Sequence, residues 1–312
     1  MNNKYELLTD QTISVFGRTL FRIKAKIAFS DVAAGDIGGY IEKQENLETS
    51  GDAWVYGNAC VSGDAWVSDN ARVSGDTWVY GNACVSGDAR VYGNACVSGD
   101  ACVSGNARVS GDTWVSGNAH VSGNAQVYGN TCVSGDACAS GDARVYGNAC
   151  VSGDAQVYGD AWVYGNACVY GDACASGDAR VYGNAWVYGN ACVSGDACVS
   201  GNARVSGDTW VYGNAQVSGD AWVSGNARVS GNAHVSGNAH YMTISPIGSR
   251  DDSITFTRTK TLGIYVFAGC FSGTIAEFRA KVQKTHGDNK HAKAYLLAAD
   301  LAEIRIDLSG NG

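Results

Sequence analysis

From Gly51 to Met242 the chain repeats the six-residue phrase Gly-(Asp/Asn)-Ala-x-Val-(Ser/Tyr) 32 times, without an insertion or a deletion. A period this short is too small for a helical hairpin or a propeller blade. Each copy must therefore supply one strand and one corner of a coil whose neighbours bury its apolar face. The repeat predicts an all-β solenoid.

The order of residues within the phrase predicts which side chains lie inside. In an extended strand Ala and Val point to one side, whereas position x and Ser/Tyr point to the other. Ala and Val are nearly constant, while x is Trp, Cys, Arg, Gln or His, so we expect Ala and Val in the core and x on the surface. Gly followed by Asp or Asn suits a corner, because Gly tolerates positive φ and Asx side chains bond to nearby backbone. Four strand residues and two corner residues are expected for each face.

Three such faces close a triangular coil, so three consecutive phrases are expected to make one turn. At this point the chain resembles the hexapeptide-repeat proteins, in which an aliphatic residue is followed four positions later by a small one, as in Val55 with Ala59 and Val61 with Ala65. The match covers the whole stretch 51–242. This resemblance implies a left-handed parallel β-helix, and it also implies a homotrimer, since trimers are common among such proteins.

Both ends of a parallel β-helix expose unpaired strand edges, so the flanking segments are expected to be caps. Residues 1–50 are predicted to form an N-terminal cap with a degenerate first coil, and residues 51–242 the repeat solenoid. Ile37 lies three phrase lengths before Val55, while Ile41 and Leu47 lie two and one before Ala53, which predicts the register of that coil. Apolar and basic residues alternate over 21–27, which predicts an amphipathic strand that covers it.

Residues 243–312 lose the repeat and are predicted to form a small α+β module. Residues 253–259 and 263–267 favour a hairpin, and Thr274 with Glu277 forms a capping box for a helix. A last helix is expected to begin near Asp288, with that residue as its cap. Its predicted apolar stripe consists of Leu297, Leu301, Ile304 and Leu308.

The charge distribution disfavours nucleic acid as a partner. Residues 51–242 carry 16 aspartates and seven arginines, a net charge of −9, against −1 before them and +2 after them. Phosphate-backbone binding requires clustered Lys and Arg instead. Regular aspartates on a rigid solenoid could themselves imitate a phosphate ladder, which leaves an acidic nucleic-acid mimic as a third alternative. No basic-then-apolar leader or membrane-spanning run is evident, so we expect no membrane association and a cytoplasmic location.

The whole chain is also similar to a group of uncharacterised bacterial and prophage proteins, which are often labelled transferases on the strength of the repeat. The similarity includes a short N-terminal segment, the long repeat, and the ending from Cys270 to His291. It implies a bacterial or phage origin, in the host cytoplasm or associated with a virion. It brings no established reaction.

The hypothesis that this protein is an enzyme depends on a few histidines. Hexapeptide-repeat acyltransferases use a His as general base, and the candidates here are His120, His234 and His240. Those enzymes also carry a loop that interrupts the repeat and builds the pocket, whereas no copy here has an extra residue. A trimeric zinc hydratase would need three converging His ligands, but counting by threes puts these histidines on three different faces.

Two further groups of residues carry reactive side chains. Cys270, His286, Asp288 and His291 form a possible polar cluster that could contain a Cys–His nucleophile pair. Capping of the last helix by Asp288, with the two histidines beside it, is a plainer explanation. Eleven of the 12 cysteines occupy position x, and Cys132, Cys150 and Cys168 follow one another at intervals of three phrases. Columns of cysteines of this kind could bind a soft metal or be oxidised. The alternative is that position x simply faces outward and tolerates many residue types, cysteine among them. We therefore expect no cofactor.

Surface residues at position x favour a binding role. The expected contacts are cationic and aromatic and would serve a glycan or a protein partner; they come from Arg72, Arg90, Arg108, Trp54, Trp66, Trp78 and Trp114. The function predicted from the sequence is a non-enzymatic, rigid β-solenoid scaffold or interaction protein associated with a phage or prophage. A hexapeptide-class acyltransferase is the alternative.

Overall fold

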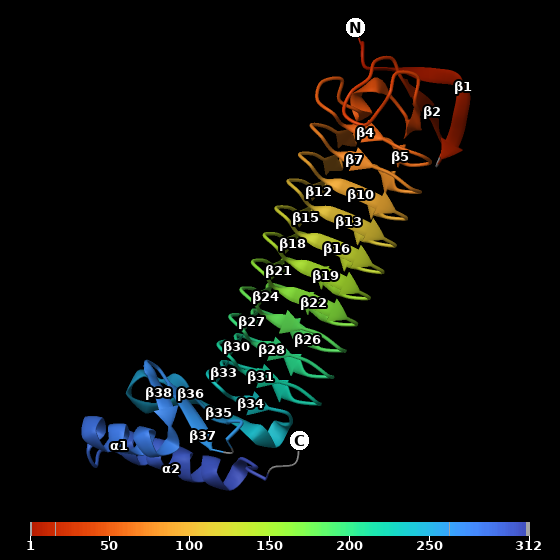
Figure 1. Cartoon of the computed structure of the whole chain (residues 1–312). Coiled ribbons are helices and arrows are strands. Elements are labelled where there is room, and N and C mark those ends of the chain that lie inside the picture. Colours follow the sequence, from red (N-terminus) through yellow and green to blue (C-terminus); the bar gives the residue numbers. More distant parts are fainter. Residues whose placement is uncertain (1, 16, 262, 310–312) are drawn as a thin grey trace. The chain divides into compact units, whose positions relative to one another are not determined.

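The computed structural model, drawn in Figure 1, describes residues 2–15, 17–261 and 263–309. The chain forms two compact units, residues 1–160 and 161–312. Both units contain coils of a parallel β-solenoid in which each turn consists of three phrases and contributes one strand to each of three sheets. One of the three sheets has 11 strands among the described residues, which gives about 11 turns. The predicted solenoid and its period are confirmed.

In residues 1–160 the strands fall into three sheets. The first contains β3 (Ile37–Ile41), β5 (Cys60–Val61), β8 (Trp78–Val79), β11 (Cys96–Val97), β14 (Trp114–Val115), β17 (Cys132–Val133) and β20 (Cys150–Ser152). The second contains β4 (Trp54–Val55), β7 (Arg72–Val73), β10 (Arg90–Gly93), β13 (Arg108–Gly111), β16 (Gln126–Gly129) and β19 (Arg144–Gly147). The third contains β6 (Trp66–Val67), β9 (Cys84–Val85), β12 (Cys102–Val103), β15 (His120–Val121), β18 (Cys138–Ala139) and β21 (Gln156–Val157).

Backbone hydrogen bonds join each coil to the next in one register. Arg72 N–H donates to the carbonyl of Ala89 at 2.9 Å, and Ser74 N–H donates to that of Val91 at 2.9 Å. The neighbouring corner is bonded in the same way, from Asn70 N–H to Gly87 at 3.0 Å. Position x of one coil therefore lies beside position x of the next coil, three phrases further along the chain.

The interior is built from the Ala and Val positions, as predicted. Val91 and Ala89 are fully buried, as are their equivalents along the repeat. Where Thr replaces Ala, its hydroxyl is satisfied by the backbone: Thr113 Oγ1 donates to the carbonyl of Ser110 at 2.6 Å. A buried hydroxyl needs such an acceptor, so the substitution is accommodated without an unpaired polar group.

The strands are shorter than expected from the phrase. Most contain two residues, x and Val, and only β10, β13, β16, β19 and β22 (Trp162–Gly165) reach four. The expectation of four strand residues per face is wrong for most copies, because the turn back at each corner takes up four of the six residues. A positive φ at nearly every repeat Gly marks these corners.

The N-terminal segment covers the first coils with antiparallel strands. Strand β1 (Tyr5–Val15) pairs with β2 (Arg18–Ala25), and β2 pairs with β3. The amphipathic strand is confirmed as far as Ala25, whereas Ile27 is exposed. The strand β1 was not expected.

The degenerate coil exists, but its predicted register is wrong. Ile41 pairs with Val61 and Leu47 pairs with Val67, and in both cases the offset is two residues longer than three phrases. Ile37 pairs with Lys24 in β2 and is exposed, so it does not align with Val55. The two extra residues lie in the loop after the 3-10 turn η1 (Gln44–Asn46), where the strict repeat has not yet begun.

A buried lysine closes the first coil. Lys4 Nζ donates to the carbonyls of Ala53 at 2.8 Å, Glu48 at 3.2 Å and Ser50 at 3.4 Å. Burial lowers the pKa of Lys4 to about 8, although the charges of Asp52 and Glu48 oppose the shift. The carbonyls are thus satisfied at an end of the solenoid that has no further coil to bond to.

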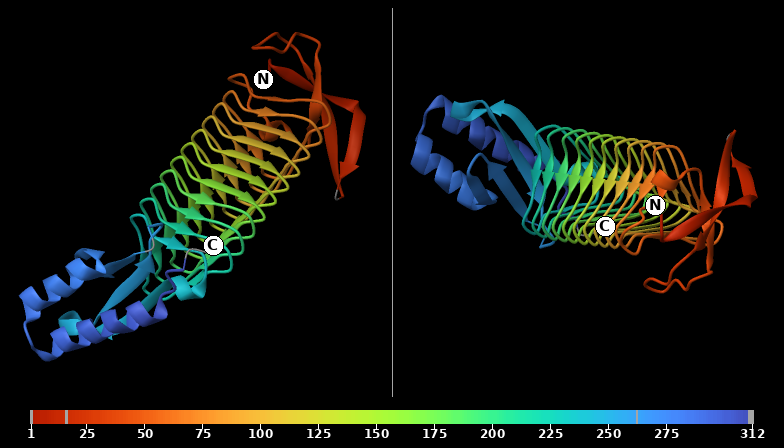
Figure 2. Two further views of the ribbon diagram at one scale, coloured as in Figure 1. Left: turned by 60° about the horizontal axis from the view of Figure 1, so that its bottom comes forward. Right: turned by 90° about the horizontal axis from the view of Figure 1, so that it is seen from above.

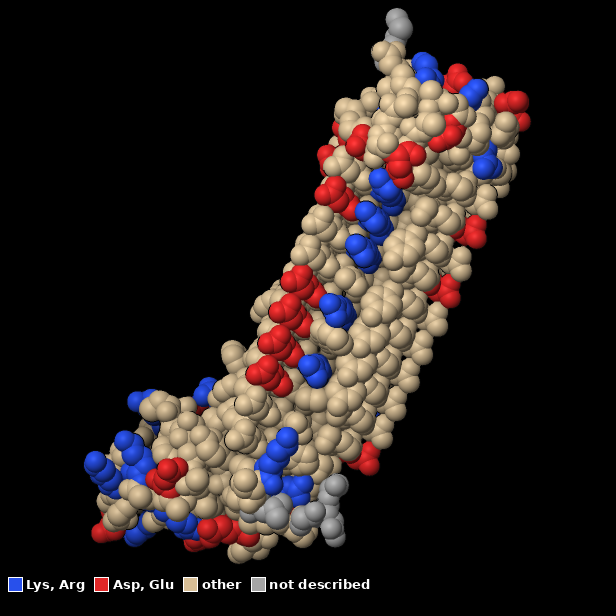
Figure 3. Space-filling model, viewed as in Figure 1, with Lys and Arg blue, Asp and Glu red and all other residues tan. Residues whose placement is uncertain are grey.

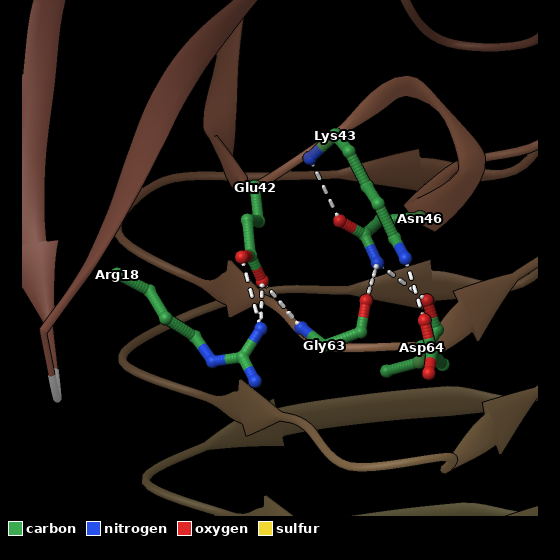
Figure 4. A network of polar contacts seen from close by, with 7 residues as sticks. Arg18, Glu42, Lys43, Asn46, Gly63 and Asp64 are labelled. Carbon is green, nitrogen blue, oxygen red and sulfur yellow. Dashed lines mark hydrogen bonds and ion pairs between the residues drawn. The ribbon is translucent and has the colours of Figure 1, made fainter.

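Polar contacts fasten the same segment to the repeat (Figure 4). Glu42 accepts from Arg18 Nη1 at 2.8 Å and from the Gly63 N–H at 2.6 Å. Asn46 is fully buried and donates to the carbonyls of Gly63 at 3.0 Å and Ala65 at 2.8 Å. These side chains replace the strand-to-strand bonds that a preceding coil would make.

In residues 161–312 the solenoid continues in three sheets. One contains β23 (Cys168–Tyr170), β26 (Trp186–Tyr188), β29 (Arg204–Val205) and β32 (Trp222–Val223). Another contains β22, β25 (Arg180–Val181), β28 (Cys198–Val199), β31 (Gln216–Val217) and β34 (His234–Val235). The third contains β24 (Cys174–Ala175), β27 (Cys192–Val193), β30 (Trp210–Val211) and β33 (Arg228–Val229). The last copy of the phrase forms no coil strand and instead contains the 3-10 turn η2 (Asn238–His240) and the start of β35 (Tyr241–Ile247).

The C-terminal module is a four-stranded antiparallel sheet with two helices (Figure 2). Its elements are β35 (Tyr241–Ile247), the 3-10 turn η3 (Gly248–Arg250), β36 (Asp252–Arg258), β37 (Ile264–Ala268), β38 (Phe271–Thr274), α1 (Ile275–His286) and α2 (Lys290–Arg305). The hairpin and the Thr274–Glu277 capping box are confirmed. The cap of α2 is Asn289 rather than Asp288, because the Asn289 side chain accepts from the N–H groups of His291 and Ala292.

The module packs on the last coils of its own unit. Thr259 forms an isolated antiparallel β-bridge with Ala233. The Arg228 N–H donates to Thr255 Oγ1 at 3.0 Å. The Asp307 N–H donates to the Ala239 carbonyl at 2.9 Å. It therefore covers an edge of the solenoid, as expected of a cap.

The predicted apolar stripe of the last helix does not face the core. Leu297, Leu301 and Ile304 are exposed by 67, 49 and 84%, and Leu308 follows the helix as a partly buried residue. The buried face of α2 consists instead of small residues, Ala292, Ala298, Ala299 and Ala302. Small side chains let α2 approach α1 and the sheet, where Phe278 and Phe256 fill the core.

Stability measurements distinguish these two faces. We expect Leu301→Gln to change the free energy of unfolding by no more than about 0.5 kcal/mol, because the side chain is exposed. Phe278→Ala should cost about 3–5 kcal/mol, since it opens a cavity among buried residues. The melting of the helical circular-dichroism signal, which α1 and α2 supply, measures both. Equal destabilisation by the two substitutions would place Leu301 in the core.

Candidate functional site

Arginines form a column on the outer side of the second sheet of residues 1–160. Arg72 lies beside Arg90, and Arg90 beside Arg108, in the register predicted from the spacing of the repeat. Gln126 and Arg144 continue the same column. The outward side of β7, β10, β13, β16 and β19 is called the arginine face below; Figure 3 shows a line of basic side chains on the solenoid surface.

The arginines differ in how they are held. Arg72 makes an ion pair with Asp31 at 3.0 Å and donates to Ser30 Oγ at 3.2 Å. Arg90 and Arg108 are exposed, and neither forms an ion pair or a hydrogen bond through its side chain within the described ranges. Two adjacent guanidinium groups are therefore available to a partner.

A groove of about 350 Å³ runs along these arginines. Its other wall is the corner column, where Asn70 donates to Asp88 at 2.9 Å. The groove is lined by Ser30, Asp52, Asn70, Arg72, Asp88, Arg90, Asn106 and Arg108. Guanidinium, amide and carboxylate groups thus alternate along a polar and open surface, which suits an extended polar ligand better than an enclosed one.

Tyrosines occupy the second outward position of the same face. Tyr92 and Tyr128 are exposed by 41 and 37%. The rings of Tyr128 and Tyr146 stack with centroids 5.1 Å apart and planes inclined by 4°. These tyrosines and Arg144 were not predicted as site residues, although the spacing of the repeat would have found all of them.

The tryptophans do not assemble with the arginines. Trp54 is 1% exposed, in edge-on contact with Tyr5 and Phe29, so its assignment to the binding surface is wrong. The N-terminal segment folds over this one copy and buries it. Trp66 lies in the third sheet, whereas Trp78 and Trp114 lie in the first. Trp66 and Trp114 are about half exposed.

The three candidate histidines have different surroundings. His120 is exposed, with Nδ1 2.7 Å from the carbonyl oxygen of Asn118. His234 and His240 both lie near the buried Arg258, whose Nη2 is 3.3 Å from His234 Nδ1. Burial, and then the charge of Arg258, lower the pKa of both histidines. These two residues help to attach the C-terminal module to the last coil.

Cys270 and His286 line one pocket in the C-terminal module. The pocket has a volume of about 220 Å³, and Tyr295, Arg250 and Lys281 also line it. The His286 ring lies 5.6 Å from that of Tyr295 and 6.3 Å from that of His291. No Cys270–His286 hydrogen bond occurs among the residues that the structure describes, and Asp288 accepts from Gln283 at 3.3 Å. The predicted polar cluster thus contained two residues of this pocket, Cys270 and His286, but the pocket itself was not predicted.

The cysteine columns are in register where strands of one unit pair. Cys132 lies beside Cys150, Cys84 beside Cys102, and Cys174 beside Cys192. No disulfide joins any of the 12 cysteines, all of which the structure describes, and Cys168 is half-buried in β23. The hydrogen bond from Cys84 lowers the pKa of Cys102 to about 6 and raises that of Cys84. A bond from Cys150 likewise lowers the pKa of Cys132 to about 6.

Clustered metal ligands and membrane-spanning helices are absent from the described ranges. Between residues 2 and 309, apart from the undescribed positions, no three His, Cys, Asp or Glu side chains converge to hold one metal ion. In the same part of the chain, no helix has the length and apolar character needed to cross a membrane.

The repeat region matches a known family model, the YdcK beta solenoid repeat. The matches cover residues 65–81, 101–117, 143–159, 155–171, 176–189, 197–213 and 221–237. The chain is a β-solenoid repeat protein. A search with the whole chain found no matching curated protein.

The thiol pairs give a measurable pH dependence. We expect the alkylation rate of Cys102 by iodoacetamide to rise with a midpoint near pH 6, because its thiolate accepts the bond from Cys84. Burial raises the pKa of Cys96, so its profile should rise at higher pH. Tryptic peptide 91–108 contains both residues, and fragment mass spectrometry therefore gives both profiles from one sample. Cys84→Ala should move the Cys102 midpoint upward and leave Cys96 unchanged; an unmoved midpoint would contradict the paired assignment.

Proposed function

We propose that this protein is a non-enzymatic, rigid β-solenoid scaffold whose arginine face binds an extended anionic glycan. The observation that carries the proposal is the column of Arg72, Arg90 and Arg108, of which the last two are exposed and unpaired among the described residues. A flat face of in-register strands repeats its contacts at each coil. A linear polymer can use such a series of contacts, whereas a small substrate cannot.

The chemistry of the face favours a polyuronate. A guanidinium group presents a planar pair of donors that matches a carboxylate, and the charge assistance strengthens each bond. Strands of one sheet lie about 4.8 Å apart, so Arg90 and Arg108 offer such a fork at a short, regular interval. The exposed rings of Tyr92 and Tyr128 add apolar surface beside the arginines, and sugar rings can pack on aromatic side chains of this kind.

Nucleic acid fits the same face less well. Asp52 and Asp88 line the groove beside the arginines, and they would lie close to the phosphates of a bound strand. A uronic acid polymer carries fewer charges and many hydroxyls, which the alternating Asn and Asp side chains can bond. The acidic corners also support the less favoured idea of a nucleic-acid mimic.

The remaining parts of the proposal come from the resemblance alone. They are a left-handed, hexapeptide-type coil, an association with a phage or prophage, and a location in the bacterial cytoplasm or on a virion. The acyltransferase alternative has no specific support at His120, which lines none of the grooves described above, or at His234 and His240, which pack around Arg258.

Substitution of the exposed arginines tests the proposed contact. We expect the double variant Arg90→Gln and Arg108→Gln to bind polygalacturonate at least about tenfold more weakly, since each charge-assisted bond is worth about 1.5–3 kcal/mol. Gln126 occupies the same slot, so the replacements should not disturb the fold. Affinity electrophoresis in gels with polygalacturonate measures the change, with neutral dextran as the reference polymer.

The matched control is Arg204→Gln with Arg228→Gln, which changes the net charge equally. Both arginines are exposed in the other unit, in β29 and β33, and neither strand belongs to the sheet that carries the arginine face. Retardation of the control should stay at the level of the unsubstituted protein. An equal loss in both variants would indicate general charge attraction, and retardation that neither variant alters would refute the arginine face as the binding surface.

We also propose a homotrimer, since flat faces suit lateral association and the resemblance implies it. Light scattering behind a sizing column should then give three times the 32.4 kDa chain mass, with and without reductant. A monomer, or a mass that falls when reductant is added, would contradict this part of the proposal. The glycan contact does not depend on it.

A further inference from the structure

Three pairs of cysteines stand side by side on the solenoid surface. Cys84 and Cys102 lie in register on β9 and β12, and Cys132 and Cys150 on β17 and β20. Cys174 and Cys192 form the third pair on β24 and β27. Position x points outward, and all six side chains are half-buried and not joined by disulfides. Each pair is a dithiol that the backbone ladder holds in place and that solvent can reach.

The spacing of these dithiols suits one kind of metal coordination. Neighbouring strands in a sheet lie about 4.8 Å apart. A metal–thiolate bond is about 2.3 Å long, so a linear sulfur–metal–sulfur unit spans about 4.6 Å. A two-coordinate ion therefore fits between two in-register cysteines with little movement of the backbone.

Two thiolate ligands per pair are too few for a metal such as zinc. Zinc requires four ligands in a tetrahedron, whereas a third member of the column stands two strands from the first, about 9.6 Å away. In the described ranges no third His, Cys, Asp or Glu converges on any of these pairs. Soft thiolate ligands without further donors select the cuprous ion.

The surroundings of the first pair support a negatively charged complex. Ser86 and Ser104 occupy the second outward position of the same phrases, two residues after Cys84 and Cys102. Hydroxyl donors beside metal-bound thiolates orient them and offset their charge. His120, the next residue in the column, faces Asn118 through Nδ1 and keeps that nitrogen away from the pair.

We infer that each in-register cysteine pair of the solenoid is a binding site for one cuprous ion. Two sulfur–copper bonds form, and two sulfur–hydrogen bonds break with the release of both protons to solvent. The product is a bis-thiolate complex with a net charge of −1, and no electron is transferred. The repeat thereby converts a variable surface slot into a metal site wherever two successive coils both carry Cys.

Titration of the full chain with cuprous ion tests the inference. The reduced protein is titrated under anaerobic conditions against bicinchoninate, a chromophoric cuprous chelator that should outcompete isolated thiols, and native mass spectrometry counts the bound ions. We expect Cys102→Ser to bind one ion fewer than the unsubstituted protein, and Cys192→Ser also one fewer. The double variant should bind two fewer.

The matched control is Cys96→Ser, which removes a thiol that has no Cys neighbour in its column. Cys96 lies between Trp78 and Trp114, and its replacement should leave the number of bound ions unchanged. Equal losses for Cys96→Ser and Cys102→Ser, or no uptake against the chelator by the unsubstituted protein, would overturn the inference. Unaltered circular dichroism of the apo-variants separates loss of a ligand from loss of the fold.

Discussion

The in-register hydrogen bonding between successive coils is the constraint on which the rest of this molecule depends. It requires a corner of constant length, and glycine makes that corner. At Gly105 the backbone has φ +67°, and a Cβ atom there would lie 3.0 Å from the carbonyl oxygen of Gly123 in the next coil. At such a corner a side chain strains the turn and crowds the next coil. Glycine opens every phrase but one and keeps the ladder continuous; the exception is Asp69, which adopts φ +59°.

This ladder turns a linear repeat into columns of stacked side chains. In the corners, an Asn amide often donates to an Asp carboxylate of the next coil, as Asn118 does to Asp136 at 2.7 Å, which avoids direct repulsion between stacked carboxylates. On the faces, the same geometry places Arg90 beside Arg108 and Cys84 beside Cys102. The proposed glycan face and the proposed cuprous sites both follow from one constant offset of three phrases.

The ends of the solenoid require different solutions because no further coil satisfies their backbone groups. At the first coil Lys4 donates to three carbonyls and the buried Asn46 to two more. In the C-terminal module Arg258, 3% exposed, donates to the carbonyls of His234 and Ser309. Long polar side chains thus replace the missing strand at both places. The same region contains His234, which is half-buried, and His240, which is buried.

The sequence by itself determined the period, the inward Ala and Val, and the columns of Arg and Cys, because a strict repeat transmits its register through every coil. Only the tertiary structure decided what happens outside the repeat. Trp54 is buried because a non-repetitive segment folds over it, and Ile41 pairs with Val61 because two residues are added in a loop. Helix α2 turns its alanines inward against α1 and the sheet, and leaves Leu297, Leu301 and Ile304 exposed. Such choices depend on the shape of the surface opposite, which local spacing does not contain.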